Sequence, residues 1–440
     1  MARQSVRESA ARSYARSLPI APALASGAIV TGADGRSYLD CLSGAGTLAI
    51  GHNHPEVIAA LRSTLDSGAP LHVLDMITPD KDAFTAALLA LLPGELRDVA
   101  KVHFCSPAGT DAVEAALKLA RVATGRSGVI AFSGGYHGMT LGAVAVSGSA
   151  RMRTAAGTLD TGGIGVTRLP FPYDYRCPFG VGAPLSAELS AHLLATMLDD
   201  ASSGVGRPAA VILEVVQGEG GVIPAPDRWL RAVREVTAER GVLLIVDEVQ
   251  TGIGRTGTFW ACERAGVTPD ILVAAKAVGG GLPLAVIAYR PALDVWSPGD
   301  HTGTFRGNTL AMVAGRVTLE VVTRQRLPER AARVGAVLVE GLRSLARRHT
   351  MIGDVRGRGL MIGAEIVDPV GDVDELGARP AAPLLAAALR TAALRNGLIV
   401  ELGGRADTVL RLLPPLTITD AEAQLVLDRL AAACAEVTAG

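Results

Sequence analysis

Lysine is almost missing from this chain of 440 residues. Of its 42 basic residues only four are lysines, namely Lys81, Lys101, Lys118 and Lys276. Arginine fills nearly every other position that carries a positive charge, so charge alone is a weak explanation for a lysine that persists. An amine can lose its proton and act as a nucleophile, which a guanidinium cannot. A lysine in an apolar setting is therefore a candidate for chemistry.

The chain also carries almost no net charge. The 42 basic and 43 acidic residues leave a formal net charge of −1, which argues against nucleic acid or an anionic membrane as an obligate partner. No run of about 18 uninterrupted apolar residues occurs, so no membrane span is predicted. The arginine-rich N-terminus lacks the apolar stretch of a secretory signal.

Cysteine is sparse, and no pair has CxxC spacing. The five residues are Cys41, Cys105, Cys177, Cys262 and Cys434. This usage suits a reducing compartment, and we expect the cysteines to pack as small apolar residues of a cytoplasmic protein. His52 and His54 alternate in GHNHP without a third ligand, so no metal site is predicted.

The length predicts two closely packed domains. Short apolar runs alternate with helical segments, which predicts an α/β fold with a mainly parallel sheet and helices on both faces. The expected strands of this sheet are residues 102–105, 128–132, 209–216, 242–246 and 271–275, with an amphipathic helix over 80–92. We assign residues 61–310 to this large domain. Residues 1–60 and 311–440 are expected to form a smaller α+β domain from the two chain ends, with a hairpin near 28–40 and strands near 352–355, 361–366, 398–400 and 409–412.

The chain is organised around residues 241–283. Asp247 stands at the carboxyl end of the first apolar run, where open α/β sheets place their ligands. Lys276 ends the second run, just before three consecutive glycines. Burial would lower the pKa of this amine and allow it to form a Schiff base, while a carboxylate one strand earlier suits the ring nitrogen of a pyridoxal cofactor. The alternative is a surface lysine whose stem lies on apolar neighbours.

Several motifs resemble the class III, or ω-amino-acid, aminotransferases. They are VDEVQTGIGRTG, AAKAVGGGLPL, GTDAVEAALKLAR and EVVQGEGG, in which Val215 replaces the family's usual proline. The resemblance implies a fold type I pyridoxal-phosphate (PLP) transferase with Lys276 and Asp247 as catalytic residues. It also implies a set of cofactor-binding residues: Gly109, Thr110, Tyr136, His137, Glu214, Asp247, Gln250, Lys276 and Thr304.

The resemblance gives some of these residues particular roles. Gly109 and Thr110 are expected to hold the phosphate at a helix N-terminus, where free N–H groups and the helix dipole favour an anion; the alternative there is a simple helix cap. Tyr136 is expected on the pyridine ring and Gln250 at the phenolic oxygen. Thr304 is expected to reach the phosphate of a neighbouring subunit, which implies a homodimer with shared active sites.

The resemblance also implies a substrate-binding set of Arg411, Glu219 and Thr47. Glu219 is expected to pair with Arg411 when no dicarboxylate is bound. One site could then accept an ω-amine in one half-reaction and a keto acid, held by the guanidinium fork, in the other. Thr47 belongs to a glycine-rich loop expected to face the substrate.

A competing motif lies inside the central stretch, since residues 252–257 (GIGRTG) satisfy G-x-G-x-x-G. This pattern is a dinucleotide fingerprint when it directly follows a strand and a ribose-binding acid lies about 20 residues onward. Here Asp247 through Gln250 intervene, and no such acid is evident. The dinucleotide interpretation is therefore disfavoured.

Further segments resemble one subgroup, the diaminobutyrate–2-oxoglutarate aminotransferases. They are ARSYARSLP, CLSGAGTLAIGHNHP, PLHVLDMITPDKDAF, FPYDYRCPFG, HTGTFRGN and IVELGGR followed by RLLPPL. The resemblance implies transfer of the 4-amino group of L-2,4-diaminobutyrate to 2-oxoglutarate. Another ω-amine such as ornithine, lysine or 4-aminobutyrate, an aminomutase, and a non-enzymatic binding protein remain alternatives. Arg306 suggests an extra positive group near the interface, or an arginine that caps a carbonyl.

Overall fold

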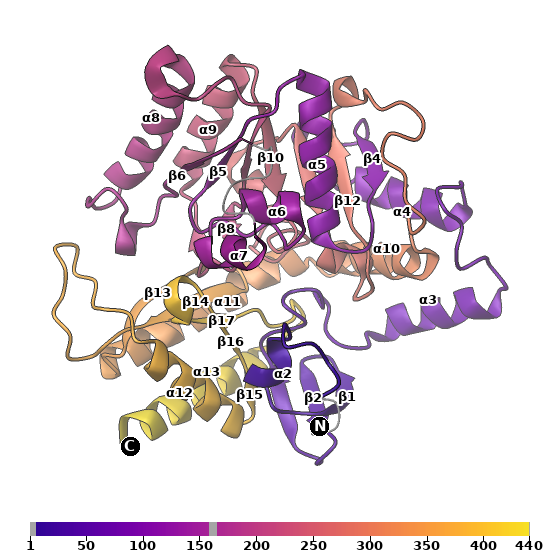
Figure 1. Ribbon diagram of the computed structural model, residues 1–440. Helices are drawn as coiled ribbons and strands as arrows, with labels where there is room; N and C mark the ends of the chain where they lie inside the picture. Colours follow the sequence, from indigo (N-terminus) through magenta and orange to yellow (C-terminus); the bar gives the residue numbers. More distant parts are fainter. Residues whose placement is uncertain (1–5, 158–164, 440) are drawn as a thin grey trace.

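The computed structural model describes residues 6–157 and 165–439. A seven-stranded sheet forms the centre of the larger lobe (Figure 1). Its strands run in the order β4 (Lys101–Phe104), β12 (Val286–Tyr289), β11 (Ile271–Ala274), β10 (Leu243–Asp247), β7 (Ala210–Leu213), β5 (Val129–Phe132) and β6 (Val166–Leu169). Adjacent strands are parallel, except that β12 runs antiparallel to β11 and β4. The predicted mainly parallel sheet is confirmed, with one antiparallel strand that was not predicted.

Alternate residues of these strands supply two apolar cores, one on each face of the sheet. Ile245 and Ile271 belong to the core under α5 (Gly109–Thr124), whereas Leu244 and Val246 belong to the larger core on the opposite face. The helices of this lobe are α3 (Pro55–Asp66), α4 (Pro79–Leu89), α6 (Leu141–Val146), α7 (Ala150–Ala155), α8 (Leu185–Asp199), α9 (Asp227–Glu239) and α10 (Thr309–Arg324). Helices therefore cover both faces, as the alternation of runs predicts.

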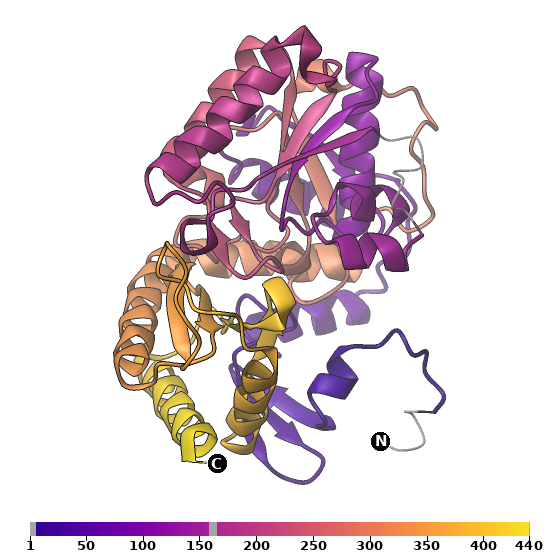
Figure 2. The ribbon, with the colours of Figure 1, turned by 60° about the vertical axis from the view of Figure 1, so that its left-hand side comes forward.

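Both ends of the chain meet in the smaller lobe (Figure 2). One sheet has the order β1 (Pro22–Ser26), β2 (Ile29–Gly32), β3 (Ser37–Asp40) and β15 (Leu398–Ile399), and the other β13 (Ile352–Arg358), β14 (Met361–Ile366), β17 (Val409–Leu412) and β16 (Glu401–Gly403). The helices are α2 (Tyr14–Ser17), α11 (Leu327–Arg348), α12 (Pro383–Arg395) and α13 (Asp420–Ala439). Parallel pairing of β3 with β15 ties the two chain ends into one unit.

The strand expected over 209–216 is interrupted in the structure. The strand that belongs to the large sheet, β7, ends at Leu213. Val216–Gln217 (β8) instead forms a small hairpin with Ile223–Pro224 (β9). Glu214 lies at the break and Glu219 in the hairpin turn, so both acids leave the sheet at its carboxyl edge. The expected helix over 80–92 is shorter and ends at Leu89, although Leu92 is still buried.

The GIGRTG segment is a tightly packed turn between the lobes. A Cβ on Gly254 would lie 3.2 Å from Pro328, and one on Gly257 would lie 3.1 Å from the Ala332 side chain, both on α11. Arg255 is buried and donates hydrogen bonds to the carbonyls of Leu360 and Pro414. The glycines thus serve close packing against α11, which explains the motif without a dinucleotide.

None of the described helices has the length and apolarity needed to cross a membrane. The α/β class and the smaller lobe built from both chain ends are as predicted. The domain limits at residues 60 and 310 stay predictions, and residues 1–5 and 440 of the smaller predicted domain lie outside the described residues.

Candidate active site

A cavity of about 260 Å³ opens at the carboxyl edge of the large sheet. It is lined by most of the residues that the sequence proposes for the site, which are Gly109, Thr110, Tyr136, His137, Glu214, Glu219, Asp247, Gln250 and Lys276. These residues come from the ends of β4, β5, β7, β10 and β11 and the loops that follow them. Separate motifs of the chain therefore converge because parallel strands end at a common edge.

Lys276 follows β11 and begins a short 3₁₀ turn (Lys276–Gly279). Its φ of 53° lies in the left-handed region, which is unfavourable for a residue with a side chain. Burial lowers the pKa of the Lys276 amine, while the nearby Glu219 carboxylate opposes that shift and Arg411 adds to it. The net shift of the pKa is downward, toward the unprotonated and nucleophilic form of an amine that lines the cavity.

Asp247 ends β10 and is held from two directions. Its Oδ1 accepts a hydrogen bond from the Val249 N–H at 3.0 Å, and its Oδ2 lies 2.8 Å from Nδ1 of His137. Burial opposes a charge on His137, but the hydrogen bond to Asp247 and the carboxylates of Asp247 and Glu214 outweigh it and raise the pKa of His137. His137 therefore orients Asp247 and stabilises its negative charge.

Glu214 shapes the loop that carries Tyr136. Its Oε1 accepts the Tyr136 N–H at 2.8 Å and its Oε2 accepts the Gly218 N–H at 3.0 Å. Burial raises the pKa of Glu214 to about 7; His137 opposes this shift and the Asp247 carboxylate adds to it. Glu214 thus links the Tyr136 loop to the hairpin that carries Glu219.

The N-terminus of α5 faces the same cavity. The helix begins at Gly109, so Gly109 and Thr110 are its first two residues. The first N–H groups of a helix have no partner inside the helix and favour an anion. Thr110 Oγ1 lies 2.7 Å from Oγ1 of Thr140 and accepts the Thr140 N–H at 3.1 Å, so this hydroxyl is held in place beside the helix end.

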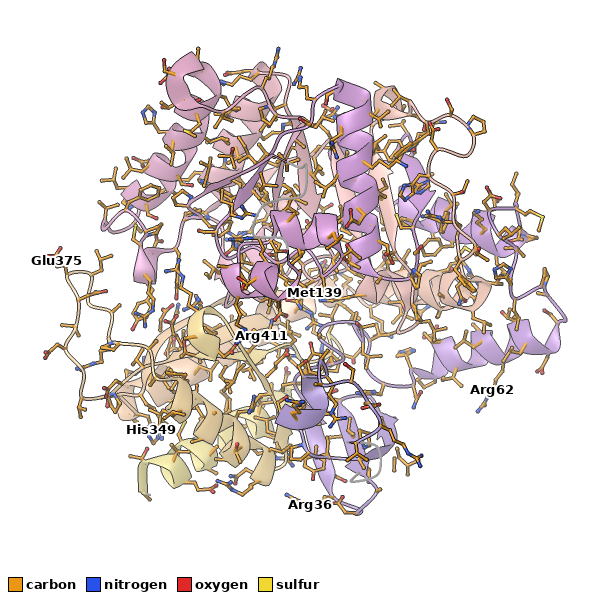
Figure 3. The ribbon with its side chains drawn as sticks, viewed as in Figure 1. Arg36, Arg62, Met139, His349, Glu375 and Arg411 are labelled. Atoms are coloured by element: carbon orange, nitrogen blue, oxygen red, sulfur yellow. The ribbon has the colours of Figure 1, made fainter. Side chains whose placement is uncertain are left out.

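Arg411 lies next to the cavity with a completely buried side chain, in the zone between the lobes (Figure 3). Its Nη1 donates to Glu219 Oε1 at 2.7 Å and its Nη2 to Glu219 Oε2 at 3.0 Å. The predicted Glu219–Arg411 pair is therefore present, as a bidentate fork. Nη2 also donates to Glu401 Oε2 at 2.6 Å, a second carboxylate that sequence reasoning missed.

Two other residues of this region were not predicted. Met139 lines the cavity. Tyr14 is hydrogen-bonded to Glu401, and the pKa of Tyr14 is raised by burial and by the Glu401 and Glu219 carboxylates. The sequence offered a signal for Glu401, which is an acid inside the apolar run IVEL, and for Tyr14, which lies in the motif ARSYARSLP.

Three remaining residues lie away from the cavity. Thr47 sits in the loop whose Ala45 carbonyl accepts a hydrogen bond from Gln250 Nε2 at 3.1 Å, but it does not line the cavity. Thr304 lines a separate cavity of about 820 Å³. Arg306 is buried beside that cavity and donates to the carbonyls of Phe104 at 3.1 Å and Thr302 at 2.8 Å, which supports the interpretation of a carbonyl-capping arginine.

The described residues contain no cluster of three or more His, Cys, Asp or Glu side chains arranged to hold a metal ion. His52 instead lies 2.8 Å from a carboxylate oxygen of Asp40. The cavity does fit PLP. Lys276 offers the amine, Asp247 a carboxylate for the ring nitrogen, and α5 an anion site. The buried Oε1 of Gln250 has no hydrogen-bond partner in the described part of the chain, as expected for a group that meets a ligand.

Sequence comparisons agree with this geometry. The class III aminotransferase family matches residues 10–434. A diaminobutyrate–2-oxoglutarate aminotransferase of Rhizobium meliloti (strain 1021) is 56% identical over 98% of this chain and 91% of its own length. The corresponding aminotransferase of Haemophilus influenzae is 49% identical over 97% of this chain and 93% of its own length.

Structural comparisons give the same result. An amine transaminase from an uncultivated Pseudomonas species, solved in a PLP-bound form, superposes with a TM-score of 0.84 at 33% identity and covers 97% of both chains. The ornithine aminotransferase of Toxoplasma gondii ME49 has a TM-score of 0.82 at 27% identity, over 100% of this chain and 94% of that one. The predicted fold type I class is confirmed. The chain therefore belongs to the class III aminotransferases and is a PLP-dependent enzyme.

Proposed function

We propose that this enzyme transfers the 4-amino group of L-2,4-diaminobutyrate to 2-oxoglutarate, giving aspartate 4-semialdehyde and glutamate. The observation that carries the proposal is the bidentate Glu219–Arg411 pair beside Lys276, because it suits a site that must accept both a diamine and a dicarboxylate. The named activity of the relatives from R. meliloti and H. influenzae supports this choice of substrates.

Bound PLP supplies an aldehyde that takes up the amino group and a pyridine ring that accepts electron density. Lys276 Nζ, whose pKa is lowered by burial, is the proposed base that removes the proton from the substrate carbon bearing the amine and returns one in the opposite half-reaction. Asp247, oriented by His137, keeps the ring nitrogen protonated. Gly109 and Thr110 are the proposed phosphate ligands.

The other cavity residues complete the proposed cofactor site. Tyr136 lies on one side of the cavity and is the proposed ring contact, while Gln250, with its unpaired Oε1, is the proposed partner of the phenolic oxygen. Glu214 holds the backbone of the Tyr136 loop. Thr47 is proposed to shape the substrate side through the loop that Gln250 holds at Ala45.

Glu219 decides which amine of diaminobutyrate reacts. An uncovered Arg411 would bind the α-carboxylate of the donor and so present the α-amine, as it must for glutamate. With Glu219 on the guanidinium, the α-carboxylate loses this partner and the 4-amine can approach Lys276. For 2-oxoglutarate, Glu219 must leave so that Arg411 can bind the carboxylate.

We also propose a homodimer in which Thr304 of one copy contributes to the site of the other. Large apolar side chains are exposed around the 820 Å³ cavity that Thr304 lines: Leu71, Leu74, Met76, Ile77 and Phe305. A cluster of this kind is typical of a protein–protein contact. The cytoplasm is the proposed location, supported by five cysteines that are all unpaired.

A panel of amino donors, each coupled to glutamate formation from 2-oxoglutarate, tests the substrate. Diaminobutyrate should exceed ornithine in kcat/KM by at least about tenfold, because one extra methylene in a shaped site costs about 10- to 200-fold. Lysine and 4-aminobutyrate serve as further comparisons. Faster turnover of any of these would reject diaminobutyrate as donor, and isomerisation without a keto acid would indicate an aminomutase.

Replacing the nucleophile tests its role directly. Lys276→Ala should lower kcat by about 10²- to 10⁴-fold or more, because general acid–base catalysis contributes that much, and PLP should become removable by dialysis. Borohydride treatment of the wild type should fix the cofactor mass on the peptide that contains Lys276. Lys101→Ala, at an exposed lysine, should change neither result; covalent PLP in Lys276→Ala would contradict the assignment.

Glu219→Gln removes the charge that covers Arg411. Glutarate, a dicarboxylate without a keto group, should bind the holoenzyme about tenfold more tightly by calorimetry, since a neutral amide competes for the guanidinium less strongly than a carboxylate does. A larger share of diaminobutyrate should react at its α-amine, as seen by mass spectrometry of the products. Glu188→Gln, at an exposed glutamate on α8, is the control. If Glu219→Gln changes neither the glutarate affinity nor the amine that reacts, Glu219 does not mask Arg411.

The homodimer is tested by the mass in solution. Light scattering should give about twice the 45.2 kDa of one chain, or a multiple of that dimer. Ile77→Asp should shift the enzyme toward monomer and reduce activity, because a buried unpaired carboxylate opposes association. Leu384→Asp, at an equally exposed apolar position on α12, should not. A fully active monomer would exclude shared sites.

A further inference from the structure

Two arginines of the smaller lobe stand in one row of the sheet β13–β14–β17–β16. Arg356 on β13 pairs with Gly363 on β14, and Gly363 pairs with Arg411 on β17. Directly opposed residues in antiparallel strands project their side chains from the same face. Arg356 and Arg411 therefore share one face of the sheet, with a glycine between them.

The glycine leaves room for the turn that carries Glu219. A Cβ on Gly363 would lie 3.0 Å from Cβ of Val222 and 3.3 Å from the Gly221 carbonyl oxygen. Residues 218–222, the Glu219 turn, thus rest on Gly363 between the two arginines. Val222 itself has a φ of 53°, which is unfavourable for a β-branched residue. Such a turn needs contacts that hold it.

Four contacts with the rest of the chain hold the Glu219 turn, and one of them is the hydrogen bond from the Gly218 N–H to Glu214. The Glu219 carboxylate binds Arg411, the Glu219 carbonyl accepts the Gly404 N–H at 2.8 Å, and the Gly221 carbonyl accepts Nε of Arg356 at 3.0 Å. The contact with Arg411 is lost whenever Arg411 binds a substrate carboxylate. The Glu214 hydrogen bond and the contacts of Gly404 and Arg356 then keep the turn in place, and Arg356 holds the end of the turn opposite to Gly218.

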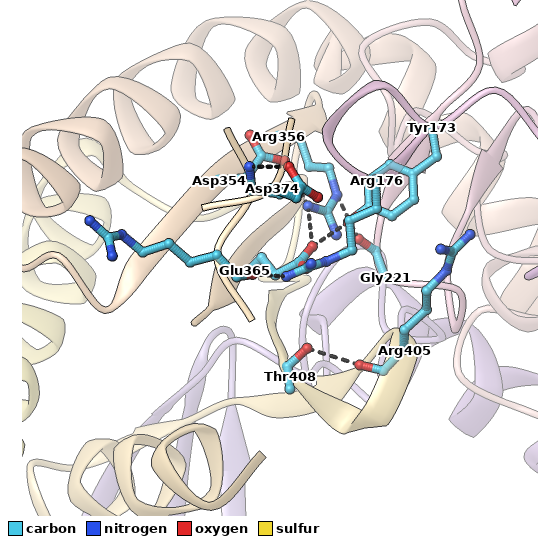
Figure 4. A network of polar contacts seen from close by, with 11 residues as sticks. Tyr173, Arg176, Gly221, Asp354, Arg356, Glu365, Asp374, Arg405 and Thr408 are labelled. Carbon is cyan, nitrogen blue, oxygen red and sulfur yellow. Dashed lines mark hydrogen bonds and ion pairs between the residues drawn. The ribbon is translucent and has the colours of Figure 1, made fainter. Parts of the chain in front are cut away.

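Arg356 is itself held firmly (Figure 4). Its Nη1 donates to Asp354 at 2.7 Å and to Glu365 at 2.8 Å, and its guanidinium lies 4.9 Å from the ring centre of Tyr173. Glu365 also accepts hydrogen bonds from Tyr173 and from Arg176 Nε, and both residues lie in the connection between β6 and α8 of the larger lobe. Arg356 is thus anchored to both lobes at the point where it touches Gly221.

We propose that Arg356 is a positioning residue that acts on Arg411 through the Glu219 turn. By holding the Gly221 carbonyl, it keeps the turn fixed, so that only the Glu219 side chain moves when Arg411 changes partner. This inference rests on the proposed masking of Arg411 by Glu219. Without Arg356 the turn loosens, Glu219 covers Arg411 less well, and the guanidinium is open to carboxylates for more of the time.

Two variants loosen the turn by different means. Arg356→Met removes the donor to Gly221, whereas Gly363→Ala removes no polar contact and adds a methyl group that presses on the Val409 side chain at 2.9 Å, on Val222 at 3.0 Å and on the Gly221 carbonyl at 3.3 Å. Gly363 has a φ outside the left-handed region, so alanine is compatible with its backbone. Arg358→Met is the matched control. Arg358 lies on the same face of β13 and binds the Ala225 carbonyl and Asp227, beyond the Glu219 turn.

The readouts are glutarate affinity of the holoenzyme and the ratio of α-amine to 4-amine products from diaminobutyrate. Arg356→Met and Gly363→Ala should each tighten glutarate binding and raise the product ratio by about two- to tenfold, the range set by one hydrogen bond. Arg358→Met should change neither. General damage to the fold would instead weaken glutarate binding and leave the product ratio unaltered.

A double-mutant cycle separates this inference from the proposed function. In a Glu219→Gln background, Arg356→Met should have no further effect on either readout, because the two residues act in series. The positioning role is wrong if Glu219→Gln shifts both readouts but Arg356→Met and Gly363→Ala shift neither. It is also wrong if the effect of Arg356→Met persists in the double variant. If Glu219→Gln shifts neither readout, the masking itself is wrong. Should Arg356→Met not fold, Gly363→Ala carries the same test.

Discussion

The ion pair between Glu219 and Arg411 is the interaction on which the rest of the site depends. A fully buried guanidinium needs partners, because an uncompensated charge in the protein interior costs several kcal/mol. Arg411 comes from the smaller lobe and Glu219 from a hairpin that leaves the large sheet, so the pair can form only where the lobes meet. The requirement to compensate one charge therefore couples the packing of the lobes to the site where we propose that the substrate carboxylate binds.

The large sheet provides the other half of the site. Parallel strands end at one edge, and that edge collects Asp247, the Tyr136 loop, Lys276 and the N-terminus of α5. Burial then sets the chemistry of each group: it lowers the pKa of Lys276 toward a neutral amine and raises that of Glu214, while His137 supports the charge of Asp247. One cavity brings together a buried amine, an anchored carboxylate and a helix N-terminus because the topology places them at the same edge.

The sequence predicts these strand-end residues well, since each stands next to an apolar run or a glycine turn whose conformation is local. It does not predict Glu401 or Arg356. Their roles depend on strand register within the small sheet and on contacts with the Glu219 turn, which lies more than a hundred residues away in the chain. The antiparallel strand β12 was missed for a similar reason, because its direction is decided by its neighbours β11 and β4 rather than by its own residues. The GIGRTG motif shows the converse. Its local pattern matches a dinucleotide-binding loop, but in the fold its glycines allow close packing against α11.

Glu401 explains how Arg411 can give up Glu219 without losing its place. Glu401 on β16 stands directly opposite Arg411 on β17. Its carboxylate is held in place by hydrogen bonds from Tyr14 and from Arg411 Nη2. When Glu219 leaves, Arg411 keeps one carboxylate that holds its Nη2, and its Nη1 is free to bind the substrate. In the proposed exchange the incoming carboxylate would meet a guanidinium that Glu401 already orients, and it would replace the two charge-assisted hydrogen bonds of Glu219 with bonds of the same kind. An arginine with a single counter-ion would become an uncompensated buried charge when that counter-ion moved away, and the second carboxylate prevents this.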